Sequence, residues 1–115
     1  HTVQKQLPNV HMDDLKSAWM DILKRAKLNA RHKITRETLS VREFMTDILR
    51  KLNDRRFMEF TELFDDLLEQ DESRSVLVVN FIAMLELSRE SLVEITQAEA
   101  YAPIYVRLTY QPRYN

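Results

Sequence analysis

The fold is decided by residues 73–108, which read SRSVLVVNFIAMLELSRESLVEITQAEAYAPIYVRL. Residues 76–87 are apolar on nearly every side of a predicted helix, a pattern typical of a helix that is buried on more than one face. Leu92–Gln97 and Ile104–Leu108 then alternate apolar with polar residues, as half-buried strands do. The stretch therefore predicts a buried helix followed by an antiparallel β-hairpin.

Local signals upstream predict two more helices and a short strand. Ser40 followed by Glu43 is a capping box, in which each side chain accepts a backbone amide of the first helical turn. Residues 57–60 are too few for a helix and are expected to form a brief strand. Thr61 is expected to cap the next helix, and Ser73 opens the apolar one. From Ser40 onward this is the element order of a winged-helix domain.

An amphipathic helix is predicted before that domain, from Asp13 to Asn29. Its apolar residues recur at the spacing of one helix face. They are Leu15, Ala18, Trp19, Ile22, Leu23 and Ala26. An isolated helix of this length is marginal in water, so this face needs cover. Either the rest of the chain or the groove of a partner would provide it.

The predicted fold class is mainly α with a small antiparallel β-hairpin, arranged as a winged-helix domain preceded by an amphipathic helix. The expected organisation has four parts. They are an amphipathic helical segment at 1–30, a linker at 31–39, the winged-helix domain at 40–108 and a loose tail at 109–115.

Composition excludes several functions. The net charge of -1 is not that of a typical nucleic-acid binder. The chain has no cysteine, which excludes disulfides and thiolate metal sites, and no glycine, which excludes glycine-rich phosphate loops. No apolar run approaches the roughly 18 residues of a membrane span. His1, His11 and His32 lack a fixed partner, and neighbouring carboxylates such as Asp65 and Asp66 diverge by about 100° on a helix. We therefore expect no enzyme, cofactor, metal or small-molecule substrate.

Five stretches of the chain resemble the middle-to-C-terminal region of bacterial kleisins of the segregation and condensation protein A (ScpA) family. They are LPNVHMDDLKSAWMDILKRA at 7–26, HKITRETLSVREFM at 32–45, FTELF at 60–64, VVNFIAMLEL at 78–87 and LVEITQAEAYAPIYV at 92–106. The specificity lies in their combination and order. The chain departs from the family at the hairpin tip, where Tyr101 and Ala102 replace a frequent Phe-Gly pair.

The resemblance implies a non-catalytic subunit of a chromosome condensation and segregation complex, acting in the cytoplasm at the nucleoid. In that family the winged helix docks on the ATPase head of a structural-maintenance-of-chromosomes (SMC) protein. The central region binds a second subunit, segregation and condensation protein B (ScpB). DNA would be met only indirectly, through the complex.

Candidate residues for the ATPase head lie on the apolar helix and the hairpin. By resemblance, Phe81 and Leu85 match the helix positions that meet the head, and their spacing puts them on one face. Met84 is their neighbour. Tyr101 and Tyr105 belong to an amphipathic residue type that is favoured at interfaces. The alternative is that the helix residues are ordinary core and the tyrosines ordinary surface.

Candidate residues for ScpB lie on the first predicted helix. They are Leu15, Trp19, Ile22 and Leu23. A basic run follows on the same helix and the linker, and it suits weak, salt-sensitive contact with DNA. It consists of Lys24, Arg25, Lys27, Arg31, Lys33 and Arg36. The alternative for the run is solvated surface.

Two other functions are open at this level. A winged-helix transcription factor would bind DNA directly, although its recognition helix should then carry Arg, Lys, Asn or Gln toward base edges. A homodimerisation module would explain an exposed apolar surface. A small enzyme has no supporting constellation in the sequence.

Overall fold

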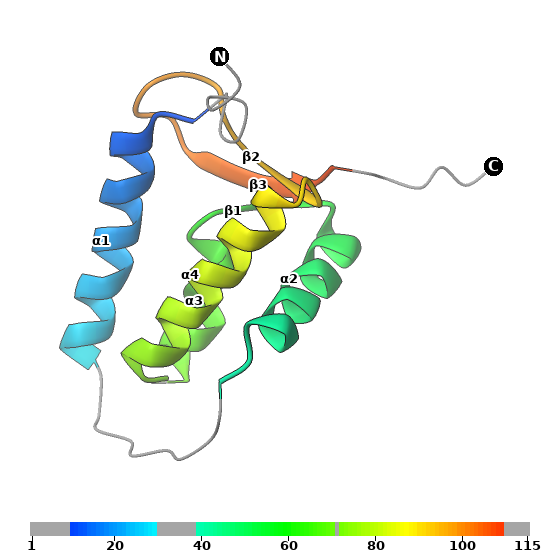
Figure 1. Cartoon of the computed structure of the whole chain (residues 1–115). Coiled ribbons are helices and arrows are strands. Elements are labelled where there is room, and N and C mark those ends of the chain that lie inside the picture. Colours follow the sequence, from blue (N-terminus) through cyan, green and yellow to red (C-terminus); the bar gives the residue numbers. More distant parts are fainter. Residues whose placement is uncertain (1–9, 30–38, 71, 110–115) are drawn as a thin grey trace.

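The computed structural model describes residues 10–29, 39–70 and 72–109, with the side chains of 27–29 left out. Within these ranges the chain forms four helices and three strands (Figure 1). In chain order they are α1 (Met12–Asn29), α2 (Val41–Arg55), β1 (Phe57–Glu59), α3 (Glu62–Glu69), α4 (Arg74–Arg89), β2 (Val93–Gln97) and β3 (Ile104–Leu108). This order confirms the predicted winged-helix-like fold class.

The strands form an antiparallel sheet in the order β1-β3-β2. The predicted hairpin pairs Ile95 with Val106, and the brief strand β1 adds Met58 on the other side of Val106. These three side chains are buried and face the helices, whereas their neighbours along the strands face outward. Figure 1 shows the sheet lying across one end of the helices.

The core is shared by all the helices and the sheet. Its most completely buried large side chains are Ile22, Leu52, Phe60, Phe64, Leu77, Met84, Leu87, Val93 and Val106. Burying one such side chain contributes about 1.5–3 kcal/mol. Because α1 supplies Ile22 to this cluster, α1 is part of the same hydrophobic core as the winged helix.

Two of the three predicted capping side chains, Ser40 and Ser73, are confirmed; of the Ser40–Glu43 capping box the structure shows the serine half. Ser40 Oγ accepts the Glu43 amide at 3.3 Å, and Ser73 Oγ accepts an amide of the first turn of α4 at 3.4 Å. The Thr61 cap was wrong, because Thr61 has helical backbone angles and makes no side-chain cap. A capping residue needs extended angles for its oxygen to reach back over the first turn.

Helix α1 packs on its own chain, against α3 and α4. In Figure 1 it stands beside α4, on the side opposite α2. Leu15, Ile22 and Ala26 are buried at this contact. Of the two ways to cover the amphipathic helix, the structure therefore shows the one within the chain.

Candidate functional site

Helix α4 presents three different sides. The side toward the sheet and core carries Leu77, Met84 and Leu87, all fully buried. Met84 was expected on the binding face with Phe81 and Leu85, but it offers no surface to a partner in this fold. Each residue turns the direction of its side chain by about 100° on a helix, so Met84 is fully buried in the core while Phe81 and Leu85 keep part of their surface.

The second side of α4 faces α1. Phe81 is half-buried there and stacks on Trp19 with ring centroids 4.2 Å apart and planes 9° from parallel. Phe60 meets the edge of Phe81 at 6.0 Å, and Phe64 tilts against Trp19 at 5.4 Å. Phe81, which was matched to the ATPase-head contact, thus lies against Trp19, which was assigned to the ScpB contact.

The third side of α4 faces solvent and is apolar in its central part, between the exposed polar residues Ser75 and Arg89. Val78 and Ile82 are 37% and 45% exposed, and Leu85 continues the same side while half-buried. Asn80, which would have had to read base edges, is buried instead, and its amide donates to the Val76 carbonyl oxygen at 3.0 Å. The exposed side of this helix therefore suits an apolar protein surface better than a DNA groove.

Polar bonds fasten the start of α1 to the hairpin. Asp14 Oδ2 accepts the backbone N–H of Tyr101 at 2.6 Å and the side-chain amide of Gln97 at 2.9 Å. Gln97 Oε1 accepts the backbone N–H of His11 at 3.0 Å. The bond from Tyr101, and then that from Gln97, lowers the pKa of the Asp14 carboxyl below its ordinary value.

The hairpin carries the exposed aromatic residues. Tyr101 is 91% exposed at the tip and has a positive φ of 68°, a conformation that glycine adopts more easily. Tyr105 on β3 meets Phe57 on β1 edge to face at 5.6 Å, on the outer side of the sheet. Phe57 was not among the candidates. Strand alternation was the signal that could have found it, because Met58 faces inward and the apolar side chain of Phe57 must then face outward.

The four residues assigned to ScpB divide into two pairs. Leu15 and Ile22 are buried in the chain's own core, so a partner would reach them only if α1 came away. Trp19 and Leu23 keep part of their surface. On the outward side of the same helix, Met12 and Met20 are more than half exposed.

The structure describes only part of the basic run. Lys24 and Arg25 are exposed on α1. The side chain of Lys27 and the residues Arg31, Lys33 and Arg36 lie outside the described part of the chain. Contact of this run with DNA stays a prediction.

No centre for metal chemistry is found among the residues that the structure describes, where no three His, Asp or Glu side chains gather in a way that could hold an ion. Within the same residues, no helix combines the length and the apolar character that a membrane span requires.

The order of elements, the small antiparallel sheet and the apolar exposed side of α4 define a winged-helix-like domain suited to protein contacts. The family model described as "Segregation and condensation protein ScpA" matches residues 1–109. The chain belongs to this family.

Three relatives illustrate the match, and each is named segregation and condensation protein A. The Xylella fastidiosa (strain 9a5c) protein is 44% identical over 100 residues, which are 87% of this chain and 32% of the relative. The Coxiella burnetii protein is 42% identical, with coverage of 87% and 36%. The Listeria welshimeri protein is 37% identical over 103 residues, with coverage of 86% and 39%. The chain thus spans about a third of the length of these relatives. No solved structure was found to match it.

Proposed function

We propose that this chain is a non-catalytic kleisin segment of a bacterial chromosome condensation and segregation complex. Its winged helix docks on the ATPase head of an SMC protein, and α1 contacts a ScpB-like subunit. Membership of the ScpA family supports the complex. The apolar solvent side of α4 supports the head contact and carries the proposal. Such a complex acts in the cytoplasm, at the nucleoid.

The head contact would use the residues of α4 and the wing that remain on the surface. Ile82 and Leu85 would form the apolar centre, with Tyr105 and Tyr101 contributing from the hairpin. Phe81 would contribute mainly indirectly, because it is half-buried and its ring stacks on Trp19. A few side chains in the desolvated centre of a contact carry most of the binding energy of a protein interface, and tyrosine is enriched among them.

The test is calorimetric titration of this chain against a purified SMC head from the same genome. Ile82→Asp should weaken binding at least tenfold, since it puts a charge into an apolar contact. Met20→Asp is the matched control, because Met20 is similarly exposed but lies on α1. Unchanged binding by the Ile82 variant, with both variants folded, would refute this docking surface.

A short DNA duplex in the same titration tests the transcription-factor alternative. Direct DNA binding would fall steeply with rising salt, because basic side chains release counterions from the phosphates. We expect at most the weak contact predicted for the basic run that begins at Lys24, since on α4 Asn80 faces the core and Arg89 is paired with Glu86 at 2.6 Å. Strong, salt-sensitive binding of the duplex would favour direct DNA recognition instead.

The ScpB contact would use the accessible part of α1, with Trp19 and Leu23 at its centre and Leu15 and Ile22 left in the core. Leu23→Asp should weaken binding of purified ScpB without unfolding the chain. Hydrogen exchange of the bound complex checks the geometry. If binding speeds exchange in α1 or α4, α1 has left the core, and Leu15 and Ile22 then become available to the partner.

A further inference from the structure

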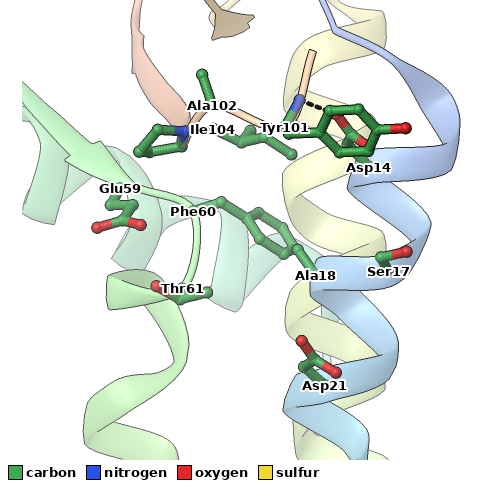
Figure 2. Close-up of a pocket in the computed structure, with 11 residues that line it drawn as sticks. Asp14, Ser17, Ala18, Asp21, Glu59, Phe60, Thr61, Tyr101, Ala102 and Ile104 are labelled. Carbon is green, nitrogen blue, oxygen red and sulfur yellow. Dashed lines mark hydrogen bonds between the residues drawn. The ribbon is translucent and has the colours of Figure 1, made fainter.

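A groove lies between α1, the start of α3 and the tip of the β2–β3 hairpin (Figure 2). It encloses about 310 Å³. Its floor is apolar, and Phe60 and Ile104 form the most buried part of it. Ala18 and Pro103 extend the apolar lining toward α1 and the hairpin. No residue of α4 lines this groove, and among its lining residues only Tyr101 is shared with the head contact proposed above, so the use of the groove does not depend on that contact.

The rim of the groove is acidic on both sides. Figure 2 shows Glu59 on one side of Phe60, and Asp14 and Asp21 on the α1 side. Asp14 is engaged by the hairpin, but within the described residues the carboxylates of Asp21 and Glu59 have no hydrogen bond or ion pair. The lining contains no Lys or Arg to neutralise them.

This combination specifies the chemistry of an occupant. An anion would be repelled by the rim, and a purely apolar side chain would strip water from two unpaired carboxylates. A long cationic side chain satisfies both parts, because its stem covers apolar surface while its head stays at the rim. Arginine fits better than lysine, since its planar guanidinium forms paired bonds with carboxylates and stacks on aromatic rings. The exposed ring of Tyr101 lies at the same rim.

We propose that this groove binds an arginine side chain presented by an extended, basic segment of a partner protein. The guanidinium lies between the carboxylates of Asp21 and Glu59, and its stem covers the accessible apolar lining at Ala18 and Pro103. Asp21, Tyr101 and Pro103 in its lining are exposed, so the groove is open to solvent and suits a side chain from an extended segment better than an enclosed small molecule.

The probe is the peptide acetyl-Ser-Val-Arg-Val-Ser-amide, titrated into the isotope-labelled chain and followed by the NMR shifts of backbone amides. Saturable shifts should gather at Ser17, Asp21, Glu59, Thr61 and Tyr101. The same peptide with glutamine in place of arginine should give none of them. Shifts elsewhere, or equal shifts with the glutamine peptide, would overturn the proposal.

Two double variants separate the groove from general charge. Asp21→Asn with Glu59→Gln should weaken the arginine peptide about fivefold or more, the effect of losing two exposed ion pairs. Asp65→Asn with Glu69→Gln removes the same charge from exposed positions of α3 outside the groove and should leave affinity unchanged. Equal weakening of peptide binding by both double variants would mean that the net charge of the chain governs the affinity, and would contradict the proposal.

One rival occupant is the chain's own Lys5, which lies upstream of the described residues. Lys5→Gln should change neither the groove amides nor the affinity for the peptide. If that variant shifts the groove amides without peptide and strengthens peptide binding, the groove is filled by the chain itself, and the proposed partner is wrong.

Discussion

Replacing Trp19 by alanine tests whether α1 belongs to the domain. Full removal of a buried tryptophan costs about 3–5 kcal/mol, and Trp19 is only partly buried. The alanine variant nevertheless lacks the stack of Trp19 on Phe81 at 4.2 Å and the contact of Trp19 with Phe64 at 5.4 Å. We therefore expect a loss of about 2–3 kcal/mol, which leaves most domains of this size folded but measurably weaker.

The assay is urea unfolding followed by circular dichroism. With an m-value of about 1.5 kcal/mol/M, the expected loss moves the midpoint down by roughly 1.3–2 M. Met20→Ala is the control, because Met20 is exposed on the same helix and should change stability by less than about 0.5 kcal/mol. If Trp19→Ala behaves like the control, α1 does not stabilise this domain, and the packing argument fails.

Three further predictions concern single side chains. Asp14→Asn removes a carboxyl whose pKa is lowered in the folded chain from its ordinary value of 3.8. The wild type should therefore have a higher Tm than the variant, with the full difference above pH 3.8 and a decreasing difference as the pH falls through the folded pKa. Thermal melts of both chains from neutral to strongly acidic pH check this, and a constant difference contradicts it. Ser73→Ala should cost about 1 kcal/mol in urea unfolding because α4 loses its cap, whereas Ser75→Ala, at an exposed position inside the same helix, should cost little. Met84→Ala should cost about 2–5 kcal/mol by the same method and Ile82→Ala much less, since only Met84 is fully buried; equal costs would refute the assignment of α4's sides.

The spacing of apolar residues predicted the helices and strands well. The capping residues, which were predicted from residue type, were right at two of three positions. Ser40 and Ser73 succeeded because a serine before an apolar helix acts within one turn. Thr61 failed because its backbone had already turned helical after the short strand β1, and Glu62 instead accepts the Glu59 amide at 2.8 Å. A side-chain cap depends on backbone angles that the residue type only favours.

The candidate surfaces were only partly predictable. Spacing put Phe81 and Leu85 on one helix face, but α4 is apolar on nearly every side, so periodicity could not tell core from surface. Met84 was misassigned for this reason. The acidic groove was invisible in the sequence, because Asp21 and Glu59 belong to elements far apart in the chain.

The sequence by itself determined the order of the elements and the hairpin, because helix faces and strand alternation are local patterns, and five of its stretches carry the resemblance to the ScpA family. Only the tertiary structure decided that α1 folds back and stacks Trp19 on Phe81. It also decided that Val78 and Ile82, rather than Met84, face solvent. The physical reason is that an apolar helix face shows only that it must be buried. Which surface buries it depends on contacts between segments that are far apart in the sequence.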